Sequence, residues 1–448
     1  MTFRYARINF CLGLLLTASM LSSLRGAEDD RSIYPRSQGE LKAVLQMLSP
    51  RRNGGSTVQT EYIQRLKQYR FIVGVPYENL QWDATQADLC QHATKILAMI
   101  GKLTHNPEKP AGMSDEEYVL CKKGCGQSNL FQGVTKPQAC VDGWMDDSGK
   151  GQVGALGHRR WCINPPMGKS AFAAGGNFAA MYAFDGSNKK VPDWDYVAYP
   201  ARGYMPVELF GARYGWSVSP NMSKYAKPEK DSVKVEVHLA DAKLAATGDP
   251  LKLDTSFVDE GGYGSGTCII FRPESFQLKA DAIYIVDITG LKTKSHKDAP
   301  LHYVVHFVSL SRIPDGPEVA AAYTKMFQQR LGDAAAISDK LDQLEAVTEL
   351  NEDENLKLAD ASIRGAVANA LEAMLKAPAL RREQEAFVKY RVLTDMEKSA
   401  AKAKDARDAK LQLAGAYRSF ADAYKGTRWG EKAAGEYEKL KKEFGAAN

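Results

Sequence analysis

The most informative stretch of the sequence is Gly157-His158-Arg159-Arg160-Trp161-Cys162-Ile163-Asn164-Pro165, together with a shorter upstream stretch, Leu103-Thr104-His105-Asn106-Pro107. Each stretch places one histidine among turn-forming and polar residues rather than inside an apolar run. Histidines so far apart in the sequence meet only if the fold brings them together. Neutral imidazole is the commonest metal ligand and the usual proton shuttle near neutral pH. The pair therefore predicts a functional site without naming a reaction.

The first 27 residues predict a secretory signal rather than part of the fold. Arg4 and Arg7 form a short basic segment, and the apolar segment that begins at Phe10 is too short to span a bilayer comfortably. An uncleaved anchor is the alternative. We therefore expect an exported protein that resides in the periplasm, on the cell surface or in the medium.

Length and charge restrict the remaining possibilities. A chain of 448 residues is too long for one hydrophobic core and predicts several domains. Residues 1–27 carry three arginines and no acid, so their removal lowers the formal net charge from +5 to +2. A charge this small excludes nucleic acid as an expected partner. No later segment is long and apolar enough for a membrane span, which leaves an unknown protein, a lipid or an envelope component as the expected ligand.

Six cysteines follow the predicted signal: Cys90, Cys121, Cys125, Cys140, Cys162 and Cys268. Export permits disulfides, and the spacing of Cys121 and Cys125 would close a small loop. The pairing of six cysteines stays open from sequence alone. A zinc cluster is the rival interpretation, although the sequence contains no Cys-x-x-Cys pair.

Apolar periodicity predicts helices first and strands afterwards. Helices are expected over residues 40–48, 61–69, 85–100 and 137–144, with one helical turn at 115–118. Strands are expected at 171–174 and 177–184. This order predicts an α/β sandwich with an antiparallel sheet over residues 28–219, including a C-terminal extension. His92 falls within the third helix, and because a lone helical histidine is usually packed or solvated, it is left out of the predicted site.

The rest of the chain predicts two further regions. Residues 232–240 alternate between apolar and polar side chains, and strands are also expected at 266–271, 282–288 and 302–310. A small β-sandwich-like domain is therefore expected over 220–313. From residue 314 to 448 the composition shifts to Ala, Lys, Glu and Leu, which predicts helices. These form either a bundle or tetratricopeptide-like hairpins, without a clear repeat period.

Four motifs in the predicted sandwich resemble the CAP superfamily (cysteine-rich secretory proteins, antigen 5 and pathogenesis-related 1 proteins), in its bacterial form with an SCP-like domain. In chain order they are Leu103-Thr104-His105, Gly126-Gln127-Ser128-Asn129-Leu130, Val141-Asp142-Gly143-Trp144-Met145-Asp146-Asp147 and Gly157-His158-Arg159. The order and spacing of the motifs carry the resemblance, which covers about a third of the chain (residues 40–184). It implies an α-β-α sandwich whose concave face holds two histidines and two acids.

The resemblance also implies a set of site residues. His105 and His158 match the two histidines, and Asp147, or else Asp146, matches the second acid. The first acid departs from the family pattern, because Ser128 stands in its place and Gln127 precedes it. A divalent ion held by His105, His158 and Asp147 would lack one carboxylate. We therefore expect at most a weak zinc site, with no other cofactor.

Three functions follow as expectations. The first is an exported binding module whose polar cavity carries the two histidines. The second is a metal-assisted hydrolase of peptides or envelope polymers, in which Asp147 activates water. The third is a scaffold whose ancestral site has decayed. The missing acid favours binding or scaffolding over catalysis, and no other nucleophile–base motif stands out in the sequence. Ser128 as a nucleophile and Gln127 as a cavity amide are weaker alternatives.

Overall fold

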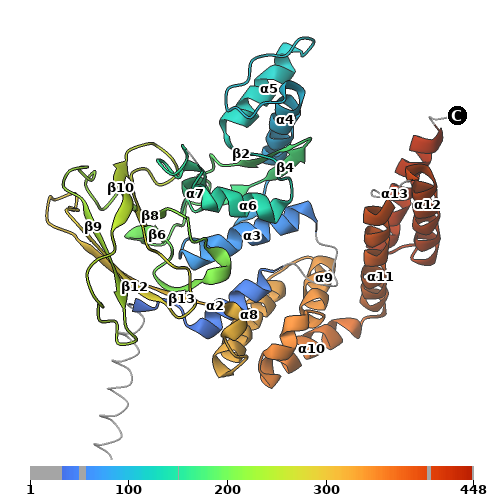
Figure 1. The fold of residues 1–448 in the computed structure, drawn as a ribbon. Helices are drawn as coiled ribbons and strands as arrows, with labels where there is room; N and C mark the ends of the chain where they lie inside the picture. Colours follow the sequence, from blue (N-terminus) through green and yellow to red (C-terminus); the bar gives the residue numbers. More distant parts are fainter. Residues whose placement is uncertain (1–32, 50–56, 150, 401–404, 446–448) are drawn as a thin grey trace, which may run out of the picture. The chain divides into compact units, whose positions relative to one another are not determined.

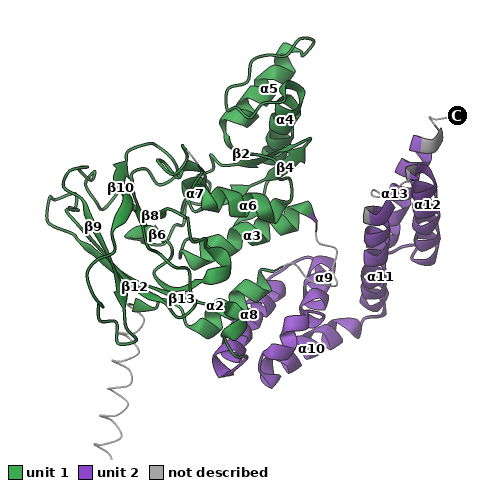
Figure 2. Cartoon of the chain, viewed as in Figure 1, with its two compact units in different colours: residues 1–49, 58–314 green, residues 50–57, 315–448 purple. Residues whose placement is uncertain are grey.

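The computed structural model describes residues 33–49, 57–149, 151–400 and 405–445 (Figure 1). The predicted signal at 1–27 lies outside them. The chain forms two compact units: unit 1 comprises residues 1–49 and 58–314, and unit 2 comprises residues 50–57 and 315–448 (Figure 2). Unit 1 mixes helices and strands, whereas the described elements of unit 2 are all helical. The division after Pro314 falls where the composition shift predicts the helical region to begin.

The first half of unit 1 surrounds a three-stranded antiparallel sheet in the order β2-β5-β4. These strands are β2 (Ser128–Gln132), β4 (Phe172–Gly175) and β5 (Phe178–Tyr182). The helices of this half are α2 (Gln38–Met47), α3 (Val58–Ile72), α4 (Ala84–Ile100), α5 (Asp115–Gly126), α6 (Pro137–Asp146) and α7 (Gly157–Cys162). A short parallel pair, β1 (Gln81–Trp82) with β3 (Lys169–Ser170), lies beside them.

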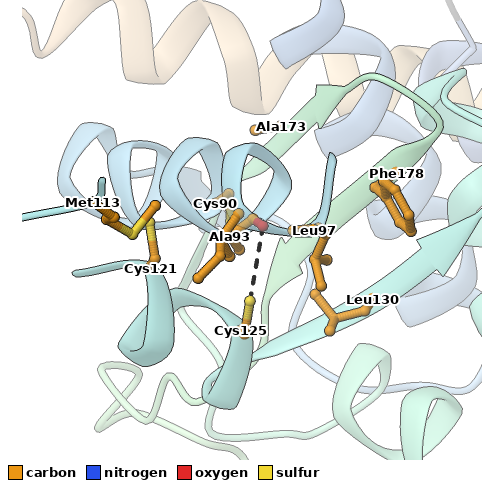
Figure 3. Close-up of a cluster of buried hydrophobic side chains, with 11 residues drawn as sticks. Cys90, Ala93, Leu97, Met113, Cys121, Cys125, Leu130, Ala173 and Phe178 are labelled. Carbon is orange, nitrogen blue, oxygen red and sulfur yellow. Dashed lines mark hydrogen bonds between the residues drawn. The ribbon is translucent and has the colours of Figure 1, made fainter. Parts of the chain in front are cut away.

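Alternate residues of this sheet face different helices, as the pleat of a strand requires. Leu130 and Ala180 belong to a buried cluster with α4 and α5 residues, among them Cys90, Ala93, Leu97 and Cys125 (Figure 3). Phe131 instead contacts Trp144 of α6, at a ring distance of 6.2 Å. Helices therefore pack on both faces of the sheet, with α4 and α5 on one side and α3 and α6 on the other (Figure 1).

Helices α4 and α5 approach each other closely at Gly124. A Cβ atom at this position would lie 2.2 Å from the carbonyl oxygen of Leu89, inside any allowed contact distance. The position therefore requires glycine, and the two helix backbones touch directly. Ser114 caps the start of α5, because its hydroxyl accepts a hydrogen bond from the backbone N–H of Glu117.

The second half of unit 1 contains two four-stranded sheets, ordered β10-β11-β8-β6 and β7-β13-β12-β9. Their strands are β6 (Tyr196–Tyr199), β7 (Gly203–Pro206), β8 (Trp216–Pro220), β9 (Lys234–Ala240), β10 (Leu253–Asp259), β11 (Cys268–Pro273), β12 (Ile283–Thr289) and β13 (Leu301–Val308). Rings from both sheets pack together: the Trp216 ring lies 5.8 Å from Tyr284 and 6.4 Å from Phe307. The short helix η1 (Val207–Leu209) lies between β7 and β8, and the short helix η2 (Leu310–Arg312) follows β13.

The predicted boundary between residues 219 and 220 is corrected by the strand pairing. Strands β6 and β8, before this boundary, share a sheet with β10 and β11, after it. Strand β7 likewise pairs in parallel with β13. Residues 196–220 therefore belong to the β region, and the boundary falls inside unit 1.

The described elements of unit 2 are helices that follow one another along the chain. They are α8 (Pro317–Ala335), α9 (Lys340–Asn351), η3 (Glu354–Leu358), α10 (Ala361–Leu375), α11 (Pro378–Ala400), α12 (Ala406–Ala423) and α13 (Arg428–Gly445). Tyr390, Tyr417 and Phe420 form the centre of the core shared by the last three helices. Across the described parts of both units, no helix combines the length and apolarity that a membrane crossing needs.

Candidate functional site

The structure brings the two predicted histidines together. The ring centroids of His105 and His158 lie 6.3 Å apart, and the ring planes are inclined by 31°. His105 belongs to the loop between α4 and α5 and is exposed, whereas His158 is the second residue of α7. The His158 side chain is 22% exposed. The pair is therefore accessible to solvent.

Asp147 orients His158 from the end of α6. It is buried and adopts a left-handed conformation with φ of 46°. One carboxylate oxygen accepts a hydrogen bond from His158 Nδ1 at 2.8 Å. The other accepts from the backbone N–H groups of His158 at 2.9 Å and Arg159 at 3.4 Å. Asp147 thus fixes both the imidazole ring and the first turn of α7.

His105 is held by a backbone acceptor instead. Its Nδ1 donates to the carbonyl oxygen of Cys125, near the end of α5, at 2.8 Å. Carbonyl and carboxylate oxygens only accept hydrogen bonds, so in both histidines the proton of the neutral ring lies on Nδ1 and the lone pair on Nε2. Within the described residues, neither Nε2 atom has a hydrogen-bond partner. Both nitrogens therefore remain available to a ligand.

Helix α7, which carries His158, is anchored by buried side chains. Asn129 of β2 donates to the carbonyl oxygen of His158 at 2.9 Å. Arg159 is fully buried and donates to the carbonyl oxygens of Met145 at 2.7 Å and Gly215 at 2.6 Å. Burial lowers the pKa of Arg159, while Tyr199, whose ring lies 4.8 Å from the guanidinium, and the nearby Asp147 act in the opposite direction. Arg159 therefore connects the histidine site to the second half of unit 1.

Arg70 of α3 secures the chain that follows α7. It is fully buried and donates to four backbone carbonyl oxygens, those of Pro76, Cys162, Asn164 and Met167. Burial lowers its pKa to about 10. Three of these carbonyls belong to the last residue of α7 and the chain after it, so this turn is fixed from the core side.

The remaining predicted site residues have other partners. The carboxylate of Asp146 accepts from the backbone N–H of Ser148 at 3.3 Å, as in an ordinary turn. The side-chain oxygen of Gln127 accepts from the Tyr182 hydroxyl at 3.2 Å. Ser128 is buried with its hydroxyl 3.9 Å from the Cys90 thiol of α4. Ser128 thus faces the α4 side of the sheet, whereas the next residue, Asn129, faces α7.

This placement corrects two sequence-based interpretations. Ser128 is not positioned as a nucleophile served by a histidine, because its side-chain neighbour is a thiol. Nor does its side chain lie where the resemblance places the first acid. Both oxygens of Asp147 accept hydrogen bonds from His158 or Arg159, so Asp147 orients His158.

Replacing Ser128 with glutamate is therefore expected to destabilise the protein without strengthening ion binding at the histidines. The side chain is 3% exposed, and a carboxylate there would enter an apolar core. We expect a loss of about 3 kcal/mol in the free energy of unfolding, measured by denaturant titration.

Gln127→Glu provides the matched control, since position 127 is only half-buried and a carboxylate can still accept from Tyr182. Its effect should stay below about 1 kcal/mol. Tighter zinc binding by Ser128→Glu would show that the side chain reaches the histidines and that the assigned orientation is wrong.

A second group of potential ligands lies between α4 and α5. All six cysteines after residue 32 are free thiols in this structure, so no disulfide forms among the described residues. Ligand atoms of His92, Glu117 and Cys121 lie within 4.8 Å of one another. The sequence interpretation missed this group because it took His92 alone. The available signal was a pair of i, i+4 spacings, Asp88 with His92 and Glu117 with Cys121.

The described residues therefore contain two arrangements with ligand chemistry, the His105–His158 pair and the group formed by His92, Glu117 and Cys121. No known relative assigns a role to either group of residues. Comparisons of the chain with protein-family models, curated proteins and solved structures gave no match.

Proposed function

We propose that this protein is an exported binding module of the CAP type, with a solvent-accessible histidine pair that holds a divalent ion weakly. The observation that carries the proposal is the convergence of His105 and His158 from separate segments, at a ring distance of 6.3 Å. The helices on both faces of the β2-β5-β4 sheet agree with the α-β-α sandwich that the resemblance implies. In this proposal the protein acts outside the cytoplasm on a protein, lipid or envelope ligand.

The donor set of the pair fits zinc. Each ring has Nδ1 occupied by an oxygen acceptor, which leaves Nε2 for an ion. Ligating histidines commonly make this outer hydrogen bond, and it fixes both tautomer and ring orientation. The ion would supply Lewis acidity or a bridging contact to an anionic ligand.

The spacing of the rings favours weak binding. Two imidazoles bound through Nε2 to one zinc ion have centroids at most about 6.4 Å apart, and about 5.2 Å apart at a tetrahedral angle. The observed 6.3 Å lies at the upper end of this range. The rings must therefore approach each other by about 1 Å to hold a tetrahedral ion. The exposed loop that carries His105 must make this adjustment, and water must complete the shell.

The same geometry argues against hydrolysis. A general base must reach a water molecule in the site, but the Asp147 side chain is only 1% exposed and its oxygens face His158 and Arg159. Burial also raises the pKa of the Cys162 thiol far above its usual value, which keeps this neighbouring group neutral. Binding is therefore the function that we propose.

Zinc titration calorimetry on the full chain tests this proposal. Cys121→Ser serves as the parent variant, so that the group between α4 and α5 does not contribute. We expect weak binding of one zinc ion, in the micromolar range or weaker, and its loss in the His105→Ala/His158→Ala derivative. The physical reason is that two Nε2 atoms are the only strong ligands the pair offers.

His302→Ala is the matched control, because His302 is an exposed histidine of β13 that pairs with Asp287. It should leave zinc binding unchanged. Equal binding by the parent and the double-alanine derivative would refute the ion-holding role of the pair. Zinc-dependent turnover of peptide or glycan libraries, abolished by a chelator, would show that the protein is a hydrolase and not a binding module.

A further inference from the structure

We infer that His92, Glu117 and Cys121 form a second divalent-metal site, which binds zinc between α4 and α5. The inference is independent of the histidine pair, because the two sites share no residue. One imidazole, one carboxylate and one thiolate are a ligand set that suits zinc, with water as the fourth ligand. The site would cross-link the two helices of one face of the sheet.

The helix geometry brings these ligands together. Glu117 and Cys121 are four residues apart on α5 and therefore share one face of that helix. His92 lies on the facing helix α4, with its Nδ1 3.9 Å from the Cys121 sulfur. Zinc–sulfur and zinc–nitrogen bonds of normal length place these two atoms about 3.6 Å apart. The atoms are therefore already near their coordination spacing.

Asp88 lies beside His92, where an outer carboxylate of a metal-binding histidine is usually found. It precedes His92 by one turn of α4, and its carboxylate lies 3.6 Å from His92 Nε2. With a carboxylate facing Nε2, the proton of the neutral ring is favoured on Nε2 and the lone pair on Nδ1. Nδ1 is the nitrogen that faces Cys121. Such outer carboxylates orient the ring and strengthen it as a ligand.

Two of the three ligands are accessible to solvent, and the third is buried. Side chains of His92 and Glu117 are 21% and 30% exposed, so an ion can arrive from solvent. Cys121 is fully buried in the cluster beside Met113 (Figure 3). Burial, and the negative charge of Glu117, raise the pKa of this thiol. Zinc must therefore displace the thiol proton to solvent as the sulfur–metal bond forms.

Lys95 is the group that competes with the ion. Its ammonium forms an ion pair with Glu117 on the surface of the two helices. Among the described residues, the other charged groups in contact with the ligands are Lys95 and Asp88, which carry opposite charges. An exposed ion pair of this kind is weak, so zinc can take the carboxylate and release the ammonium to water. Removing Lys95 should consequently tighten the site.

The test uses the full chain in the His105→Ala/His158→Ala background, so that the first site is absent. Zinc is titrated by calorimetry, and cobalt is titrated by absorbance as a probe of thiolate coordination. We expect one bound ion and an ultraviolet thiolate-to-cobalt band. Glu117→Gln should weaken binding about tenfold or more, and Asp88→Asn about tenfold. Lys95→Met should strengthen binding several-fold.

Glu116→Gln is the matched control, because Glu116 is an exposed acid of the same helix turn outside the ligand group. Its affinity should equal that of the background variant. Cys121→Ser should abolish the cobalt band, and Glu117→Gln and Lys95→Met test the site through surface positions if the serine variant fails to fold. Absence of the band, or affinities that none of these substitutions changes, would overturn the inference. The proposed function would stand in that case, since its ion binding is measured without Cys121.

Discussion

Replacing Arg159 with methionine is expected to lower the free energy of unfolding of unit 1 by about 4 kcal/mol. The guanidinium is fully buried and donates to the carbonyls of Met145, Asp146 and Gly215, and to the Ser217 hydroxyl. Methionine fills much of the volume but leaves these acceptors without a donor in a region that water does not reach. Such a loss is the main reason why substitutions at buried polar positions are costly.

Denaturant unfolding followed by tryptophan fluorescence measures this effect, since five of the six tryptophans belong to unit 1. Arg213→Met is the matched control at an exposed position and should change the stability by less than about 0.5 kcal/mol. Arg159→Lys keeps the charge but not the planar fork, so it should recover only part of the loss. A fully stable Arg159→Met variant would show that the carbonyls find other donors.

Asp147→Ala is expected to cost about 3 kcal/mol and to weaken zinc binding at the histidine pair about tenfold or more. The substitution removes the acceptor of His158 Nδ1 and of two backbone N–H groups at the start of α7. It also places alanine at a φ of 46°, a left-handed conformation that alanine adopts unfavourably. Unfolding and zinc calorimetry in the Cys121→Ser parent measure the two effects separately.

Two further variants separate the causes. Asp147→Asn tolerates the left-handed conformation but lacks the charge, so it should regain part of the stability and little of the zinc affinity. Asp146→Ala removes a carboxylate whose partner is the backbone N–H of Ser148, and it should cost less than about 1 kcal/mol. Zinc affinity that is unchanged in Asp147→Ala would show that the carboxylate does not orient His158.

Long periodic helices were predictable, whereas short elements defined by tertiary contacts were not. The pattern at 85–100 matches α4 (Ala84–Ile100) almost residue for residue. The pattern at 115–118 captures only the first turn of α5, because its glycines at 124 and 126 resemble loop signals. Strand β2 (Ser128–Gln132) was missed for a related reason. It is buried on both faces of the sheet, so its first residues do not alternate between apolar and polar.

The candidate site was predictable only in part. The likeness in motif order supplied His105, His158 and Asp147, which lie together in the structure. Sequence alone could not give the direction of Ser128, because one step along a strand exchanges the two faces of a sheet. Nor could it show that His92 meets Glu117 and Cys121, since their proximity depends on how α4 and α5 pair in space.

The glycine at position 124 has a consequence for ion selectivity. The α4 and α5 backbones are in direct van der Waals contact. The two helices therefore cannot approach each other further, and any side chain at position 124 would push them apart. The side chains of the proposed metal site must therefore adapt by rotation about their own bonds, because the distance between the two helix backbones is fixed. Ionic radius, rather than helix movement, then determines which metals the proposed site between α4 and α5 accepts.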